Sequence, residues 1–206
     1  MGQRFIHCSL VVWSLSCCLL QLVVAGLVNV TVDDTDPDPL TGNIVLYSPE
    51  GRWNVGNSCT SCLVTLDPAE TLNETWHEAV FDPATSGTDE VQTASLLFNG
   101  EQCGTLFGLR IHNFDYDIGS AIYVYGILSQ SLTNPDGAAN LSFFIDGQLA
   151  GTFDYIPPGN SNNYTYNAML WANNSIAPGS HTFSLQNGYS NRSSSLVMLD
   201  YIVYSR

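Results

Sequence analysis

The stretch LSFFIDGQLAGTFDY, residues 141–155, decides the fold class of this chain. Two apolar runs flank Asp146 and Gly147. An Asp-Gly pair suits the left-handed positions of a two-residue hairpin turn, in which both central residues have a positive φ. The stretch therefore predicts two antiparallel strands, over residues 141–145 and 149–155, joined by a tight turn.

The rest of the chain repeats this pattern. In HTFSLQ, residues 181–186, His181, Phe183 and Leu185 share one face of a strand. No segment shows a convincing helical period, and Gly, Asn, Pro and Ser separate the short apolar runs. Strands are predicted over residues 28–33, 44–47, 76–81, 94–98, 121–128, 141–145, 149–155, 166–171, 181–186 and 196–204. Ten short strands predict an all-β fold, a single jelly-roll-like β-sandwich.

The first 25 residues are predicted to be a secretory signal peptide. Arg4 is followed by a nearly continuous apolar run over residues 5–24, and small residues up to Ala25 suit cleavage. The run is also long enough to be an uncleaved signal anchor. Residues 26–206 would then form one domain of a protein that is secreted to the extracellular space or cell wall, with no membrane span after signal removal.

The charge of the chain is strongly negative. It contains 19 Asp and Glu against 5 Arg and no Lys, a formal net charge of −14. Phosphate backbones and anionic membranes would repel such a surface, so nucleic acid is excluded as a partner class. High solubility is the simplest consequence of the charge.

Two of the cysteines form the motif CTSC, Cys59 and Cys62. In an oxidising compartment this pair predicts a short disulfide loop. A redox motif would need a helix behind the first cysteine, and a zinc site would need a second Cys/His pair. Cys103 is left over, and three cysteines lie in the predicted signal peptide.

Six Asn-x-Ser/Thr motifs predict N-glycosylation of a secreted chain. They begin at Asn29, Asn73, Asn140, Asn163, Asn173 and Asn191.

The order of motifs over residues 26–206 resembles a family of uncharacterised secreted or membrane-anchored proteins of mushroom-forming (basidiomycete) fungi. The motifs are VTVDDTDPDP (30–39), IVLYSPEGRWNVGNSCTSC (44–62), TWHEAVFDP (75–83), AIYVYGIL (121–128), LSFFIDGQLAGTF (141–153), YNAMLWA (166–172) and LVMLDYIVYS (196–205). The resemblance implies a galactose-binding-like jelly roll, an architecture that many carbohydrate-binding modules share. It implies no established activity.

Residues 101–119 interrupt the family pattern, in which the strand ending at Gly100 runs on directly into the one beginning at Ser120. The 19 residues correspond to 57 nucleotides, and both junctions can be encoded with intron-like ends. The segment is interpreted as a retained or mispredicted intron, and the alternative is an insertion loop. Joining the flanks would remove Cys103 and His112.

A calcium site is one interpretation of Asp33, Asp34 and Asp200. Jelly rolls of the galactose-binding type often bring their first and last strands together around a structural calcium, and carboxylate oxygens suit that ion. Alternatively, the first two are a solvated turn and Asp200 pairs with backbone amides or an arginine. No other cofactor is predicted.

Aromatic side chains are the candidate sugar-binding groups, because sugar faces stack on flat rings. Trp53 lies in a loop-like stretch, and Trp76 precedes a histidine and a glutamate. These two residues and Tyr125 are the predicted ligand-binding residues, although most aromatic residues of a sandwich belong to its core.

The favoured function is non-catalytic binding at the fungal cell surface or wall, with carbohydrate as the partner. One alternative is a glycan-active enzyme with paired carboxylates, for which Glu50, Glu78 and Asp82 are candidates. Another is a structural surface protein without a small ligand. The chain carries no hydrolase elbow, zinc-protease motif or nucleotide-binding loop, and no catalytic residue is predicted.

Overall fold

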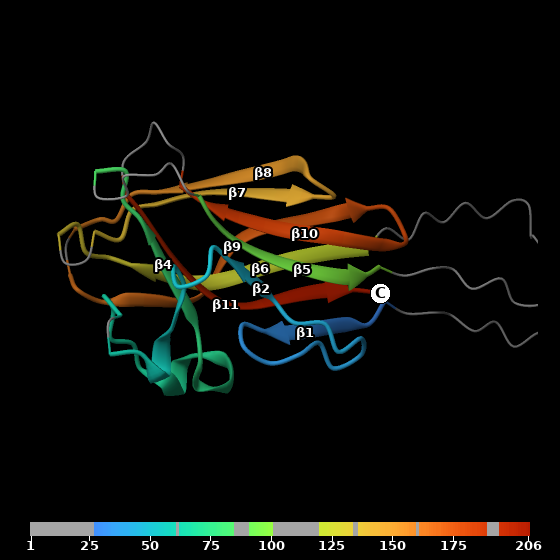
Figure 1. Ribbon diagram of the computed structural model, residues 1–206, viewed down its shortest axis with the longest axis horizontal. Coiled ribbons are helices and arrows are strands. Elements are labelled where there is room, and N and C mark those ends of the chain that lie inside the picture. Colours follow the sequence, from blue (N-terminus) through green and yellow to red (C-terminus); the bar gives the residue numbers. More distant parts are fainter. Residues whose placement is uncertain are drawn as a thin grey trace, which may run out of the picture.

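A computed structural model describes residues 27–60, 62–84, 91–100, 120–133, 136–159, 161–188 and 194–206. Its strands form two antiparallel sheets that pack face to face, as Figure 1 shows. The predicted all-β sandwich is therefore confirmed. The predicted signal peptide, residues 101–119 with Cys103, and Asn191 lie outside the described ranges.

Sheet A is built around the last strand of the chain. Its spatial order is β3 (Asn54–Val55), β4 (His77–Phe81), β11 (Ser195–Ser205), β6 (Ser120–Ser129) and β9 (Tyr164–Ile176). The first strand, β1 (Asn29–Asp33), pairs with the second half of β11, beyond the part that pairs with β4. The two ends of the described chain are thus neighbours in one sheet.

Sheet B contains the hairpin predicted from residues 141–155. Its order is β2 (Leu46–Ser48), β5 (Gln92–Asn99), β10 (Ser180–Asn187), β7 (Ala139–Ile145) and β8 (Gln148–Tyr155). At the hairpin turn Asp146 and Gly147 have φ values of 51° and 75°, as a turn with two left-handed residues requires. The Asp146 carboxylate also accepts a 2.8 Å hydrogen bond from the backbone N–H of Thr182.

All ten predicted strands are present, and the predicted boundaries differ from the observed ones by a few residues. The strand β3 is not predicted, because its two residues lie in a stretch rich in Gly and Asn without alternation.

The main core fills the space between the sheets. Alternate residues of the central strands point into it, among them Leu96, Phe98 and Phe183, each fully buried. Burial of each such side chain contributes about 1.5–3 kcal/mol. Phe143 stacks on Trp171 of the opposite sheet with ring centroids 5.0 Å apart.

A second, smaller core lies on the outward side of sheet A. Residues 56–75, called here the covering segment, cross that side and include the short 3₁₀ turns η1 (Gly56–Ser58), η2 (Pro68–Glu70) and η3 (Leu72–Glu74). The buried apolar residues of this core are Val64, Leu66, Trp76, Ile127, Leu196 and Met198. The predicted disulfide between Cys59 and Cys62 is present within the covering segment.

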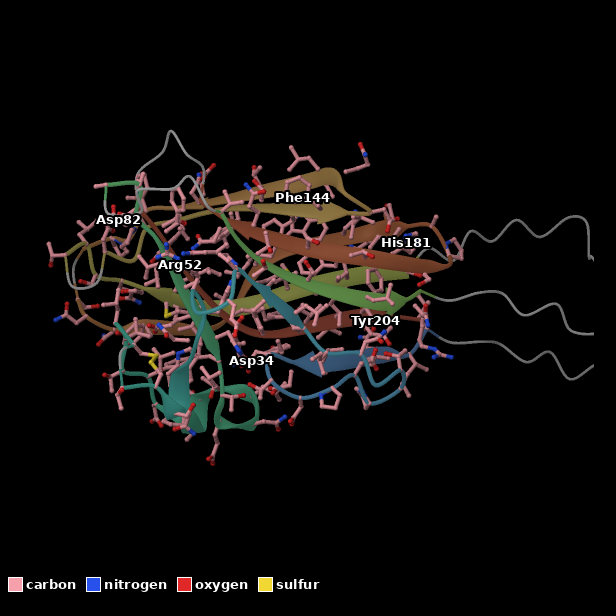
Figure 2. All side chains as sticks on the ribbon, in the orientation of Figure 1. Asp34, Arg52, Asp82, Phe144, His181 and Tyr204 are labelled. Carbon is pink, nitrogen blue, oxygen red and sulfur yellow. A yellow bond between two sulfur atoms is a disulfide. The ribbon has the colours of Figure 1, made fainter. Side chains whose placement is uncertain are left out.

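The outward side of sheet B differs from the rest of the molecule in its charge. Among its strand residues that point away from the core, Asp154 at the end of β8 carries the one charge. We call the others the neutral face: Leu46, Ser48, Thr93, Ser95, Leu97, Asn99, Asn140, Ser142, Phe144, Leu149, Thr152, Ser180, Thr182, Ser184 and Gln186. Phe144 of this face is labelled in Figure 2.

Within the described ranges, the structure contains no helix that is long and apolar enough to cross a membrane.

The two residues that flank segment 101–119 touch each other. A Cβ atom added to Gly100 would overlap the Ser120 Oγ and would lie 2.7 Å from the Ser120 Cβ. The Gly100 N–H donates a 2.7 Å hydrogen bond to the carbonyl of Gly179. The end of β5 is thus fixed beside the start of β6, at a separation that a direct connection could span with a small adjustment.

We expect a variant that lacks residues 101–119, with Gly100 joined to Ser120, to fold as the full chain does. The flanks already touch, and loss of a 19-residue connection removes a loop-closure cost of up to about 2.6 kcal/mol. Circular dichroism and thermal unfolding should show the same β spectrum and an equal or higher Tm. A control that also removes residues 97–100 should unfold, because it cuts β5. If the first variant unfolds as well, the segment is part of the fold.

Candidate functional site

Two tyrosines form a flat aromatic surface on the outward side of sheet A. Tyr125 of β6 and Tyr201 of β11 lie opposite each other in register, and their rings stack with centroids 4.7 Å apart at 18°. Both are partly exposed. The Tyr201 hydroxyl donates a 3.2 Å hydrogen bond to the Asn167 Oδ1, which fixes the ring. We call this pair the tyrosine platform.

The register of sheet A extends the platform into a row across four strands. Tyr201 lies opposite Asp33 of β1, and Tyr125 lies opposite Met169 of β9. The Met169 side chain is 56% exposed. The row thus exposes two stacked rings and a thioether as an apolar contact surface, and it ends at the buried carboxyl group of Asp33.

The covering segment forms an edge beside this row. On β9, the Tyr166 hydroxyl accepts a 3.0 Å hydrogen bond from the Asp67 N–H. On β11, the Asp200 Oδ1 accepts a 2.9 Å hydrogen bond from the Leu72 N–H. The segment therefore passes from β9 to β11 over the outward side of the sheet. Its anchor on β11, Asp200, directly precedes Tyr201 of the platform. Its exposed Glu70 lies between these two anchor points.

At the β1 end of the row lies a cluster of three carboxyl groups. Asp33 is the last residue of β1, Asp34 follows it, and Asp200 lies at an irregularity in β11, with exposures of 4%, 2% and 0%. The Asp33 Oδ2 accepts backbone N–H bonds from Thr35 and Asp36. Two oxygens, the Asp33 Oδ1 and the Asp200 Oδ2, are buried without a hydrogen-bond partner. We call these three residues the carboxylate cluster.

Hydrogen bonds from β4 and its flank hold Asp34. The Thr75 hydroxyl donates to the Asp34 Oδ1 at 2.8 Å, and the His77 Nδ1 lies 2.5 Å from the Asp34 Oδ2. Tyr47 stacks on the imidazole with ring centroids 3.8 Å apart, and its hydroxyl donates to the Asp34 carbonyl. Figure 2 shows Asp34 where β1 meets the covering segment.

Burial and the neighbouring negative charges favour the protonated forms of two members of this cluster, Asp33 and Asp200. Burial, and then the neighbouring charge of Asp34, raises the pKa of Asp33. Burial raises the pKa of Asp200 from 3.8 to about 6, and the charges of Asp34 and Asp33 add to the shift. The cluster is therefore under electrostatic strain at neutral pH unless a proton or a cation relieves it.

The predicted calcium ligands are thus brought together in space. Their hard oxygen donors, two of them unpartnered, fit the chemistry of that ion. In the described ranges, however, no group of three or more His, Cys, Asp or Glu side chains is arranged to hold a metal. The donor set fits calcium without closing around it, so calcium remains a prediction for Asp33, Asp34 and Asp200.

The three predicted ligand-binding aromatics lie in different environments. Tyr125 is part of the platform. Trp53 packs against the main core, 4.9 Å from the Tyr47 ring, and its Nε1 donates to the Ser48 carbonyl. Trp76 is 3% exposed in the second core, so its faces are covered and offer no stacking surface.

Tyr201, Asn167 and Met169 are not predicted from the sequence. A signal for Tyr201 exists: pairing AIYVY with LDYIVY in antiparallel register would place it beside Tyr125. The predicted glycosylation residues Asn29, Asn73 and Asn163 are exposed, and Asn140 and Asn173 are partly exposed. Glycosylation itself stays a prediction.

Glu78, a candidate for paired-carboxylate catalysis, is 1% exposed. Its Oε1 accepts a 2.8 Å hydrogen bond from the Leu63 N–H, and burial raises its pKa. This carboxyl group anchors the covering segment and is closed to a substrate.

No model of a known protein family matches the sequence, and no curated protein matches it. Among solved structures, a family 35 carbohydrate binding module from Clostridium thermocellum is similar, with a TM-score of 0.46 and 9% identity over 86% of this chain and 97% of the module. A CBM36-1 domain of a xylanase from the hindgut metagenome of Trinervitermes trinervoides has a TM-score of 0.33 and 14% identity, over 74% of this chain and 94% of the domain. An exo-beta-1,3-galactanase from Phanerochaete chrysosporium has a TM-score of 0.41 and 11% identity, over 78% of this chain and 27% of the enzyme. These similarities are too distant to assign a ligand or an activity to this chain.

Proposed function

We propose that this chain is a secreted, non-catalytic protein that binds carbohydrate at the cell surface or wall through the tyrosine platform. The observation that supports this most directly is the stacked pair Tyr125 and Tyr201, partly exposed on a flat sheet surface. Flat rings match the apolar faces of pyranose sugars. The exposed Asn167, which bonds to the Tyr201 hydroxyl, lies near enough to the platform to take sugar hydroxyls.

The charge of the protein favours a neutral polysaccharide over an acidic one. The net charge is −14, and the carboxylate cluster lies directly beside the platform. A polysaccharide that carries uronic acids or sulfate would be repelled there. Neutral glucans, mannans and galactans are therefore the proposed ligand class.

Replacing Tyr201 or Tyr125 with alanine should weaken binding to a neutral polysaccharide at least about tenfold, equivalent to 1.4 kcal/mol. Each change removes half of the stacking surface. Affinity electrophoresis against a panel of soluble glucans, mannans and galactans measures the loss, with thermal unfolding to confirm that the variants fold.

The matched control for this experiment is Phe144→Ala, which removes an aromatic ring from the outward side of the other sheet and should bind as the unchanged chain does. Equal binding by all variants would contradict the platform proposal. New reducing ends in the bound polysaccharide would instead favour a glycan-active enzyme. Absence of binding across the panel would favour a structural surface protein.

We further propose that calcium binds the carboxylate cluster and stabilises the fold. An ion there would neutralise the repulsion among Asp33, Asp34 and Asp200 and would partner the two buried oxygens. The Tm should rise in millimolar calcium relative to a chelator, by the mass action of a ligand that binds only the folded state. Asp200→Asn should abolish most of this rise, whereas the exposed-site control Glu50→Gln should keep it. A Tm that calcium leaves unchanged would exclude the site.

Without calcium, Asp200 should destabilise the fold at neutral pH. Its pKa is raised to about 6 in the folded state, so between about pH 4 and pH 6 the folded chain keeps a proton that the unfolded chain has released. The contribution of this group to stability therefore falls as pH rises through that window.

In a chelator, Asp200→Asn should accordingly raise the Tm at about pH 7 and leave it almost unchanged at about pH 3.5, where Asp200 is protonated in both states. The control Glu50→Gln should change the Tm little at either pH. A lower Tm for Asp200→Asn at pH 7 would show that the charged form of Asp200 stabilises the fold.

A further inference from the structure

The neutral face is unusual in a chain this acidic. The register places Leu46, Ser95, Ser184, Phe144 and Leu149 in one row across all five strands of sheet B. No residue of this row is charged. Electrostatic repulsion between two molecules that each carry a net charge of −14 is therefore weakest when they approach over this surface.

Aliphatic side chains of the neutral face are exposed to solvent. Leu46 is 63% exposed, Leu97 48% and Leu149 61%. Leu149 lies opposite Phe144, so their apolar atoms are contiguous at the β7 and β8 end of the row. The hydroxyls of Ser95 and Ser184 lie 3.0 Å apart in its middle and satisfy each other. Burial of this row would leave no charge unpartnered, and its two hydroxyls already have a partner in each other.

The other large sheet surface is unsuited to contact with a second copy. The outward side of sheet A carries the covering segment and the carboxylate cluster. Four of the predicted glycosylation residues, Asn29, Asn73, Asn163 and Asn173, also belong to strands of sheet A or to their connections. On sheet B the predicted residue is Asn140, the second residue of β7, so a glycan there would border the face rather than cover its centre.

The dimensions of the neutral face match a weak protein interface. Four strands of 7 or 8 residues and the three residues of β2, at about 3.3 Å per residue and with strands about 4.8 Å apart, give about 540 Å² per copy. Two copies would bury about 1,100 Å² in total, a size typical of weak and transient interfaces. A polysaccharide is a poorer match, because Phe144 is the one aromatic residue of the face and no stacked pair is present there.

We propose that two copies of this chain associate through the neutral face as a two-fold symmetric dimer. The same surface meets itself in such a dimer, so both copies contribute the same residues. This goes beyond the proposed carbohydrate binding and does not depend on it. If the platform binds sugar, the dimer presents two platforms on opposite outer sides and can link two polysaccharide chains.

Analytical ultracentrifugation of the full chain tests the proposal, over a range of about 1 to 100 µM, with and without enzymatic removal of N-glycans. We expect a monomer at the low end and a growing dimer fraction above it. Ser184→Glu places a charge at the centre of the face and should weaken the dimer at least about tenfold. Leu97→Glu places a charge at a second position of the neutral face and should weaken the dimer to the same extent.

The matched control is Thr31→Glu, which adds the same charge at an exposed position on the outward side of sheet A. Because Thr31 also completes the glycosylation motif that begins at Asn29, this control is compared with the unchanged chain after enzymatic removal of N-glycans. It should dimerise as the unchanged chain does, and circular dichroism should show that all three variants fold. A monomer at every concentration would overturn the proposal, as would a dimer that resists both face variants. Equal weakening by Thr31→Glu would show general charge repulsion and overturn it too. Loss of polysaccharide binding in a monomeric Ser184→Glu protein would assign the face to carbohydrate instead.

Discussion

The strand β11 is the constraint on which the rest of the structure depends. Along one edge it pairs with β6, and along the other it pairs first with β4 and then with β1. Three segments from distant parts of the sequence are therefore held in register by one strand. Its inward residues enter the main core, and its outward residues Leu196 and Met198 support the covering segment.

An irregularity in this strand creates the candidate site. The register with β6 shifts between Leu199 and Tyr201, so one extra residue, Asp200, is accommodated. As a result, the side chains of two consecutive residues both lie on the outward side of the sheet. Asp200 bonds to the covering segment, and Tyr201 stacks on Tyr125. A regular strand would turn one of them toward the core.

The sequence reveals the strands but not their partners. Alternation of apolar and polar residues marks each strand because it reports burial on one side. Register depends on contacts between distant segments, and therefore the pairing of Tyr201 with Tyr125 emerges only once AIYVY and LDYIVY are known to be neighbouring strands. The burial of Trp76 is also difficult to predict from the sequence, because the covering segment that buries it shows no apolar periodicity. The proximity of Asp33, Asp34 and Asp200 is expected from resemblance to jelly rolls, rather than from the local pattern.

The carboxylate cluster and the tyrosine platform are also physically coupled. Asp200 and Tyr201 are consecutive, and Asp33 lies opposite Tyr201. Burial raises the pKa of Tyr201, and the neighbouring Tyr125 and the charge of Asp200 add to the shift. Burying three carboxyl groups beside one another opposes folding, and the hydrogen bonds to Thr75, His77 and Leu72 offset only part of that cost. A proton or cation that relieves the repulsion therefore stabilises the same short stretch of β11 that carries the platform. By linkage, a ligand that orders the platform must then favour binding at the cluster to the same degree.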